Sequence, residues 1–277
     1  MSNSNFEKNI HSILLDMLSW FHETCKSNGL RYYCIGGTML GAVRHKGFIP
    51  WDDDIDVGMP REDYERLQSL LKSDEDSRYK IESPGPDNKD YSYLFMKLYD
   101  TETYQVENMR TPIVRGVYVD IFPLDGIGDD AESARRNFSK IFNLIRFHDT
   151  TICALRKGRV WYKNLSIIVG RLLSPLFITE RKLNDKISQM CRKRGFDECA
   201  YVGNLVGNWG YRELMPRHYF GEPKEYKFCD IVVHGVEKPH EYLSNLYGDY
   251  MTPPPLEKQK SHHDYLECDI TRSYLQK

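Results

Sequence analysis

The sequence predicts a protein that combines helices and strands (α/β in the broad sense, more specifically α+β), with a mixed sheet flanked by helices and an additional helical lobe. Helical and strand patterns alternate over residues 6–122, only helical patterns occur over 131–196, and strand patterns return at 226–236. The chain has 277 residues, 40% of them hydrophobic, which is enough to bury a sizeable core. We expect three parts: a core at 1–130, a helical lobe at 131–200, and a C-terminal segment at 201–277 that packs back on the core.

The first elements are a helix, a strand and a glycine turn. Apolar residues recur at helical spacing over residues 6–28, which predicts an amphipathic helix that covers a sheet. Residues 31–35 are aromatic and apolar and read as a short strand that leads into Gly36 and Gly37. These glycines allow a ligand to approach the backbone, and Thr38 is the expected N-cap of a second helix. A helix start of this kind favours a phosphate.

A run of aspartates follows. Four of them lie within residues 52–56, where each close pair repels by about 1 kcal/mol in water and about 4 kcal/mol where partly shielded. Strand alternation would place Asp54 and Asp56 on one face and direct Ile55 and Val57 into the core. Paired carboxylates suit Mg²⁺ or Mn²⁺ together with the oxygens of a substrate phosphate. The alternative is an acidic turn in solvent, the usual fate of a charge run.

The remaining core elements follow from the same patterns. A helix is expected from about Pro60 to Lys72, and strands at 79–82, 93–99 and 116–122. The last of these strands contains Asp120 between apolar neighbours, where burial is costly unless a cation or donor meets it. Asp120 is therefore the candidate for a third metal carboxylate. The alternative is an aspartate on the solvated face of an edge strand.

The helical lobe contains an apolar segment at 165–178. At about 14 residues it is too short to cross a bilayer of ~30 Å. Cations in or just before this segment would suit an anionic membrane surface. They are Arg156, Lys157, Arg159, Lys163 and Arg171. The alternative is a helix packed against the core with its cations in water. Farther on, we expect a hairpin at 226–236, a helix at 239–247 and an extended, proline-containing tail.

Charge and cysteine content exclude some classes of protein. Lysine and arginine number 38 against 40 acidic residues, so the chain lacks the global basic field that non-specific nucleic-acid binding requires. Residues 1–5 do not resemble the start of a secretory signal, and the seven cysteines form no Cys-x-x-Cys pair. We expect a cytoplasmic protein with reduced thiols that does not bind nucleic acid.

The motifs together resemble a known family. A glycine turn, a helix, an Asp-x-Asp strand and a later strand aspartate are similar to the nucleotidyltransferase superfamily that includes DNA polymerase beta. The longer string over residues 36–56 resembles the LicD family of phosphocholine transferases, which includes fukutin-type enzymes. The likeness extends to residues 119–125, 246–251 and 253–255. It implies a nucleotidyltransferase-type mixed sheet, with the catalytic core at 1–130.

The resemblance also implies a reaction. A phospho-alcohol, typically phosphocholine from CDP-choline, is transferred to a sugar hydroxyl of a cell-surface glycan such as teichoic acid, lipopolysaccharide or a capsule precursor, and CMP leaves. Asp54 and Asp56 would bridge Mg²⁺ or Mn²⁺, and Asp120 would hold the hydroxyl-side ion and accept the proton. Backbone amides would contact the donor phosphate, with cationic side chains nearby. The residues expected in these two roles are Gly36, Gly37 and Thr38, and Arg44, Lys46 and Lys97.

The transferred alcohol is left open by the sequence. Choline would need aromatic ring faces at about 6 Å or less, for which Trp51 is the first candidate, followed by Trp209 and Tyr211. Core packing is an equally good explanation for each ring. Ribitol phosphate or glycerol phosphate from the matching CDP-alcohol would be bound by hydrogen bonds instead. His262 and His263 are expected to close over the substrate, although adjacent histidines in a tail are more often solvated.

Two other functions remain open. A glycosyltransferase with an Asp-x-Asp motif would also use a metal ion, but it gives no reason for the early Gly-Gly-Thr. A non-catalytic binding protein could keep this fold, although all three carboxylates are present. If residues 156–178 contact lipid, the protein would lie at the inner face of the cytoplasmic membrane.

Overall fold

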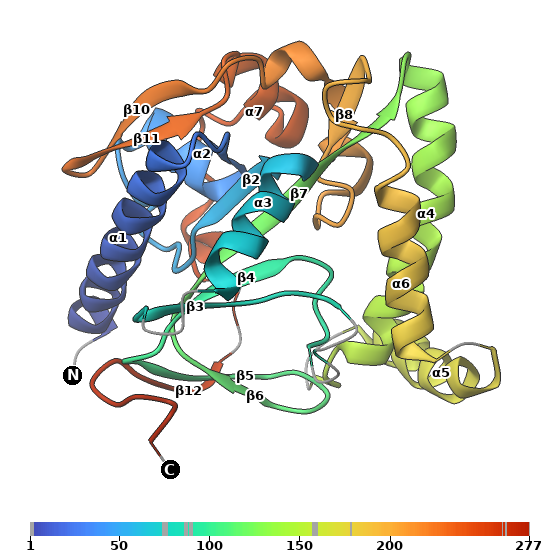
Figure 1. The fold of residues 1–277 in the computed structure, drawn as a ribbon. Helices are drawn as coiled ribbons and strands as arrows, with labels where there is room; N and C mark the ends of the chain where they lie inside the picture. The colour runs from blue at the N-terminus through green and yellow to red at the C-terminus, as the bar shows by residue number, and fades with distance from the viewer. Residues whose placement is uncertain are drawn as a thin grey trace.

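The computed structural model describes residues 3–73, 77–85, 88, 91–156, 160–177, 179–261, 263 and 265–276. It confirms the predicted α+β class, with a main sheet of 9 strands and a second sheet of 3 strands (Figure 1). The main sheet consists of β1 (Tyr33–Cys34), β2 (Asp56–Pro60), β3 (Tyr79–Glu82), β4 (Met96–Asp100), β7 (Tyr118–Gly128), β8 (Tyr201–Gly203), β9 (Met215–Pro216), β10 (Lys224–Phe228) and β11 (Ile231–Gly235). Its order is β10-β11-β1-β2-β7-β4-β3, and β8 pairs with both β7 and β9.

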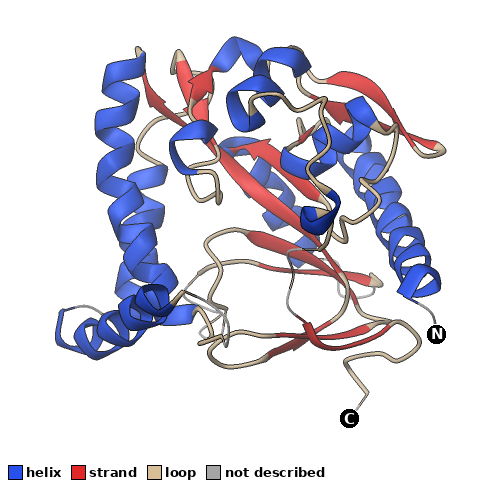
Figure 2. Cartoon of the chain, turned by 180° about the vertical axis from the view of Figure 1, so that it is seen from behind, coloured by secondary structure: helices blue, strands red, loops and turns tan. Residues whose placement is uncertain are grey.

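The second sheet was not predicted. It consists of β5 (Tyr104–Glu107), β6 (Ile113–Arg115) and β12 (Tyr265–Asp269), in the order β12-β5-β6. Strand β12 lies in the C-terminal segment, which we expected to pack back on the core, beyond the proline-containing stretch that we expected to be extended. The tail therefore returns to the core and pairs with β5, as Figure 2 shows from behind.

Seven α-helices occur within the described residues. They are α1 (Asn3–Ser27), α2 (Gly36–Arg44), α3 (Arg61–Lys72), α4 (Ala131–Ile152), α5 (Trp161–Phe177), α6 (Glu180–Cys191) and α7 (Pro239–Tyr247). Helices α1 and α3 lie in front of the sheet in Figure 1, and α2 packs against α7. Three short 3₁₀ turns are η1 (Gly210–Glu213), η2 (Arg217–Tyr219) and η3 (Leu256–Lys258).

Helix α1 shows how sequence periodicity produces the core. Its residues Leu14, Met17, Leu18 and Phe21 recur at helical spacing and are completely buried in one cluster with the sheet. The predicted amphipathic helix is therefore confirmed. The helices predicted at about 60–72 and 239–247 are confirmed as well, and α7 ends where Gly248 adopts a φ of 77°.

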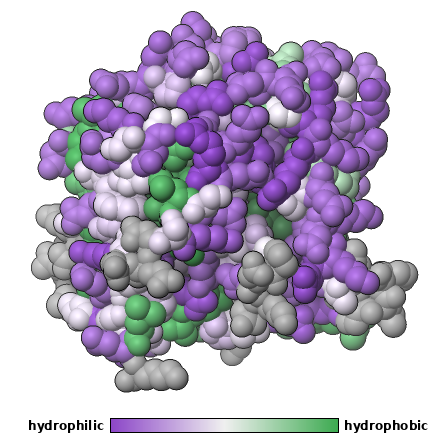
Figure 3. All heavy atoms as spheres, viewed as in Figure 1, coloured by the Kyte–Doolittle hydropathy of each residue, from purple (hydrophilic) through white to green (hydrophobic). Residues whose placement is uncertain are grey.

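The helical region predicted over 131–196 is confirmed as α4, α5 and α6. Helix α4 begins at a capping box, in which the side chain of Asp130 accepts a hydrogen bond from the amide of Ser133. Its buried face packs against α6 and the far end of β7. Figure 3 shows the molecule from the side of Figure 1 as mainly hydrophilic, including the side where α4 and α6 lie. Among the helices that the structure describes, none combines the length and hydrophobicity that a bilayer-spanning segment needs.

Two local predictions are wrong. Thr38 is not an N-cap, because α2 already begins at Gly36 and its N-cap is Ile35. The Thr38 hydroxyl instead accepts a hydrogen bond of 2.8 Å from the amide of Asp56 and thereby ties α2 to β2. Strand β4 begins at Met96 rather than at residue 93.

A buried ion pair joins α3 to the long strand β7. Asp125 is 1% exposed and accepts hydrogen bonds of 2.8 and 2.6 Å from Nε and Nη2 of Arg61. This bidentate contact explains why the motif at residues 119–125 ends in an aspartate that lies outside the carboxylate cluster described below.

Replacing Asp125 with alanine should lower the free energy of unfolding by about 3–5 kcal/mol, because Arg61 would remain buried without its counter-charge. Chemical denaturation would measure this. The matched control is Asp129→Ala, which breaks an exposed pair with Arg194 and should change stability by about 1 kcal/mol or less. Equal effects of the two substitutions would contradict a structural role for the buried pair.

Candidate functional site

Strands β2 and β7 form the floor of the candidate site. They are parallel, and Asp56 on β2 is the register partner of Asp120 on β7. Register partners on neighbouring strands point to the same face, about 4.8 Å apart along the hydrogen-bonding direction. The amide of Asp120 donates to the carbonyl of Ile55, which fixes this register at the start of β2. The predicted proximity of these two carboxylates is therefore present in the fold.

The segment before β2 adds more carboxylates. Asp54 and Asp52 lie in this segment, and their charges are among those that act on Asp56. The start of α2 borders the same cluster. A Cβ atom on Gly36 would lie 3.1 Å from Oδ2 of Asp56, and one on Gly37 would lie 2.6 Å from Oδ2 of Asp52. The glycines therefore allow the carboxylates to approach the helix start, and Gly36 also adopts a φ of 54°.

Burial and mutual repulsion raise the pKa values in this cluster. Burial, followed by the charges of Asp54 and Asp120, raises the pKa of Asp56 well above its usual range. Burial and the neighbouring Asp54 raise the pKa of Asp52 to about 8. Burial also raises the pKa of Asp120 to about 6, although Lys97 opposes this increase. The cluster thus holds more negative charge than its surroundings compensate.

Lys97 is one of the cations that compensate this charge. It lies on β4 as the register partner of Asp120, and its Nζ atom is 2.9 Å from Oδ1 of Asp120 and 3.5 Å from Oε2 of Glu107. The side chain is only 2% exposed. Its ammonium also lies 3.2 Å from the ring centroid of Tyr118. Lys97 is therefore held among buried acidic and aromatic groups.

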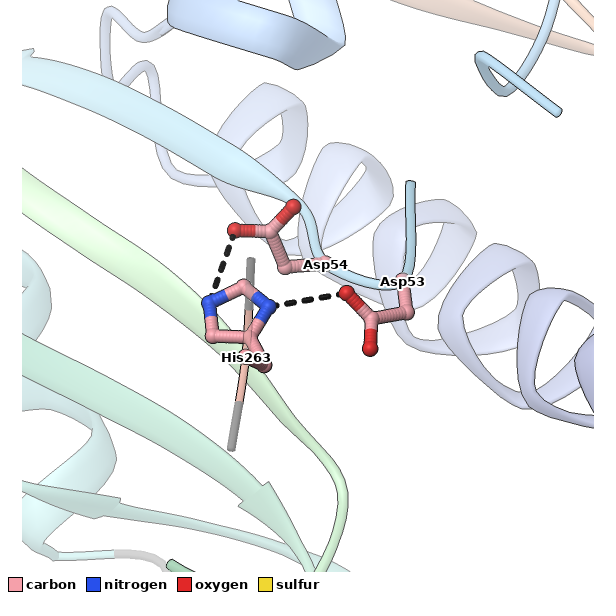
Figure 4. A group of neighbouring side chains, drawn as sticks. All are labelled: Asp53, Asp54 and His263. Atoms are coloured by element: carbon pink, nitrogen blue, oxygen red, sulfur yellow. Dashed lines mark hydrogen bonds and ion pairs between the residues drawn. The ribbon is translucent and has the colours of Figure 1, made fainter. Parts of the chain in front are cut away.

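The C-terminal tail supplies a second cation. Nδ1 of His263 is 2.8 Å from Oδ1 of Asp53, and Nε2 is 3.5 Å from Oδ2 of Asp54 (Figure 4). Burial alone would lower the pKa of His263, but the hydrogen bond to Asp53 and the charges of both aspartates raise it to about 9. The Oγ atom of Ser261 donates to Asp53 as well. His262 lies outside the described residues.

The donor set fits a divalent metal ion. Asp56 and Asp120 are register partners on two strands, and Oδ1 of Asp120 lies 2.9 Å from Nζ of Lys97. Ligand atoms of Asp53, Asp54 and His263 lie within 4.8 Å of one another. Hard oxygen ligands of this kind suit Mg²⁺ or Mn²⁺.

Three other predicted site residues are Arg44, Lys46 and Trp51. Arg44 points to the C-terminal segment, where Nη1 donates to the carbonyl of Tyr250. Lys46 is exposed in a turn with a φ of 59°. Trp51 is partly buried against the core, and its ring lies edge-on to His45.

The glycine-rich turn near residue 209 lies beside α7 rather than directly on the carboxylates. The ring of Trp209 packs edge-on to Tyr247, with 4.8 Å between centroids. Tyr211 packs on Phe138 and therefore faces the helical lobe. The amide of Gly36 donates to the hydroxyl of Tyr242 on α7, so this one amide already has a partner.

Sequence reasoning missed several residues of the site. Asp52 and Asp53 belong to the acidic run, but strand alternation singled out only Asp54 and Asp56. Glu107 and Glu213 come from separate segments, and both are buried with 8% and 5% exposure. Glu213 adds to the repulsion on Asp56. Neither glutamate belongs to a sequence motif, so the sequence could not predict that they lie near the site.

Comparison with known proteins finds one match over nearly the whole chain and others over parts of it. The family model described as "LicD/FKTN/FKRP, nucleotidyltransferase domain" matches residues 29–153. The lipopolysaccharide cholinephosphotransferase LicD of Haemophilus influenzae is 30% identical over 256 residues, which cover 91% of this chain and 93% of the relative. Human ribitol 5-phosphate transferase FKRP is 48% identical over 42 residues, 15% of this chain and 8% of the relative.

A shorter match concerns a bacterial protein without a stated activity. The uncharacterized protein RP689 of Rickettsia prowazekii is 41% identical over 68 residues, 24% of this chain and 26% of the relative. The near full-length similarity to the Haemophilus enzyme is the decisive finding, because it covers the carboxylate strands, the helical lobe and most of the C-terminal part together. The chain therefore belongs to the LicD family of transferases.

Proposed function

We propose that this protein transfers phosphocholine from CDP-choline to a sugar hydroxyl of lipopolysaccharide or of another cell-surface glycan, such as a teichoic acid or capsule precursor. The observation that carries this proposal is the pairing of Asp56 with Asp120 in register, in a chain that aligns almost completely with a lipopolysaccharide cholinephosphotransferase. A carboxylate cluster on a sheet beside a helix start is suited to phosphoryl transfer.

The reaction assigns a role to each part of the cluster. The acceptor hydroxyl oxygen forms a new bond to the phosphorus that carries choline, and the bond from that phosphorus to the bridging oxygen breaks. CMP leaves with the bonding electron pair, and the hydroxyl proton passes to the carboxylate of Asp120. Asp54, Asp56 and Asp120 would hold Mg²⁺ or Mn²⁺, which stabilises the charge on the transferring phosphate.

The alternative cargo is ribitol phosphate from CDP-ribitol. It has local support, because the match to ribitol 5-phosphate transferase reaches 48% identity. That match covers only 42 residues, whereas the match to the cholinephosphotransferase covers 256. Choline is therefore the first choice for the transferred alcohol.

Helix α5 provides a surface for peripheral contact with an anionic bilayer. Its side chains Trp161, Leu165, Ile168, Val169 and Leu172 recur at helical spacing and are 42–73% exposed. The opposite side of the helix packs on α4, where Gly170 lies against Thr150. The alternative was packing against the core; the structure instead shows packing on α4, which occupies one side of α5 and leaves this apolar stripe exposed. Such a stripe with an aromatic residue at one end is typical of helices that lie in the membrane interface.

The charges near α5 complement an anionic surface. No aspartate or glutamate occurs over residues 150–179, whereas this stretch contains five lysines and arginines. Lys163 is exposed on α5, and Arg171 donates to the carbonyl of Cys153. Lys157 and Arg159 lie outside the described residues. This charge balance favours lipid with acidic headgroups over a neutral partner surface.

The transfer reaction is tested by supplying the purified protein with Mg²⁺, the oligosaccharide of lipopolysaccharide, and CDP-choline, CDP-ribitol or a UDP-sugar in turn. We expect release of CMP and a choline-modified oligosaccharide with CDP-choline. Turnover of CDP-ribitol alone would identify ribitol phosphate, rather than phosphocholine, as the transferred group. Turnover of a UDP-sugar alone would contradict the phosphotransferase proposal.

Asp56→Asn should abolish transfer, because it removes a carboxylate from the centre of the cluster. The substituted protein should melt at or above the wild-type temperature without metal, since Asp56 is repelled by its neighbours. Mg²⁺ should raise the melting temperature of the wild type but not of the variant. Asp16→Asn, at an exposed position on α1, is the control and should retain both activity and the Mg²⁺ effect. Full activity of Asp56→Asn would refute the metal role.

Leu172→Asp should abolish binding to vesicles of phosphatidylglycerol and phosphatidylcholine, because it places a charge in the apolar stripe of α5. Sedimentation with vesicles would measure this. Wild-type binding should weaken with added salt and with pure phosphatidylcholine. Leu256→Asp, at a residue that is 82% exposed in η3, is the control and should bind like the wild type. Equal binding by all three proteins, or no binding by the wild type, would contradict the membrane contact.

A further inference from the structure

A cavity of about 290 Å³ opens beside Asp120. Strands β4, β5, β7 and β12 form one side of it, and the last turns of α4 form the other. Asp120 and His263 line it from the sheet and the C-terminal tail, and His148 lines it from α4. The cavity therefore lies between the sheets and the helical lobe, and the carboxylate to which we assign the attacking hydroxyl forms part of its wall.

Two buried polar side chains in this cavity have unused hydrogen-bonding atoms. His148 is 1% exposed, and neither of its ring nitrogens has a hydrogen-bond partner among the described residues. Glu107 is 8% exposed, and its Oε1 atom also lacks a partner there. An unpaired buried polar group is unfavourable, because it has lost its hydrogen bonds to water without replacing them. A ligand that carries several hydroxyl groups would satisfy both, because a hydroxyl both donates and accepts.

Aromatic rings form much of the remaining wall. Tyr93, Phe95, Tyr118 and Tyr265 all line the cavity. The hydroxyl groups of Tyr118 and Tyr265 are 3.1 Å apart, which joins β7 to β12. Ring faces are electron-rich and pack well against the weakly positive C–H groups of a sugar ring. Apolar walls with a few placed polar groups are typical of a small-molecule site.

The position of Lys97 argues against choline in this cavity. A quaternary ammonium would use the ring faces of Tyr118 and Tyr93, but the ammonium of Lys97 already lies 3.2 and 4.4 Å from their centroids. Choline also has no N–H group to donate to Glu107, and it would leave at least one nitrogen of His148 unpaired. A sugar uses the unpaired atoms and does not need the position that Lys97 occupies.

We propose that this cavity binds the acceptor sugar, with His148 and Glu107 as hydrogen-bonding partners of its hydroxyl groups. The proposal rests on the proposed transfer reaction only for the role of Asp120. The sugar lies along the aromatic wall, and the hydroxyl that attacks phosphorus lies at the Asp120 end. The donor is bound on the other side of Asp120, toward Asp54, Asp56 and the start of α2.

Steady-state kinetics separates the two substrates. With CDP-choline as donor and the lipopolysaccharide oligosaccharide as acceptor, His148→Ala should raise the KM for the oligosaccharide about tenfold and leave the KM for CDP-choline unchanged. His148→Gln keeps a donor and an acceptor and should restore part of the loss. Asn208→Ala, at the exposed rim of the cavity, should raise the acceptor KM as well. His218→Ala, at an exposed histidine on η2, is the control and should match the wild type.

A binding measurement keeps this test independent of the transfer reaction. Calorimetric titration with the oligosaccharide alone should show weaker binding to His148→Ala than to the wild type and the His218→Ala control. If no donor is turned over but this difference persists, the proposed function fails and the sugar site stands. An increased KM for CDP-choline with an unchanged acceptor KM would overturn the proposal, because the cavity would then hold the donor alcohol. Oligosaccharide binding that neither His148→Ala nor Asn208→Ala weakens would overturn it too.

Discussion

Repulsion between carboxylates is the constraint on which the rest of this structure depends. The parallel register of β2 and β7 places Asp56 beside Asp120, and the preceding segment adds Asp52 and Asp54. Each close pair of charges is unfavourable by about 4 kcal/mol where partly shielded from water. Hydrophobic burial around these strands must exceed that cost, and the fully buried Ile55 and Val57 next to the carboxylates are part of it. The cluster is therefore maintained by packing rather than by its own interactions.

The cations that oppose this repulsion come from distant parts of the chain. Lys97 reaches Asp120 from β4, and His263 reaches Asp53 and Asp54 from the C-terminal tail. Because β12 begins only two residues after His263 and pairs with β5, the second sheet fixes the position of the tail. The chain thus closes around the acidic strands from both sides, and the small sheet has a role in the site as well as in the fold.

Sequence periodicity predicted the elements whose burial follows a simple rule. Helix α1 and strand β3 lie where spacing predicted them, and Asp120 is buried beside Asp56 as its apolar neighbours indicated. Strands β5 and β12 were missed because they do not alternate cleanly: β5 buries Gln105 and Glu107 next to Val106. Glu107 and His148 could not be assigned to a site, since only the folding of β5 and α4 around one cavity brings them together.

Helix α4 connects the two surfaces that the proposals assign. Its last turns carry His148 into the cavity, and the chain then continues through residues 153–156 into α5, which packs back on α4. A glycan attached to lipid would need its sugar near Asp120 while its lipid remains in the bilayer. If α5 lies on the membrane and the cavity holds the sugar, as proposed, α4 and α5 together would fix the distance between the bilayer and the carboxylates. On these two proposals, the helical lobe would present the acceptor to the carboxylates on the sheet.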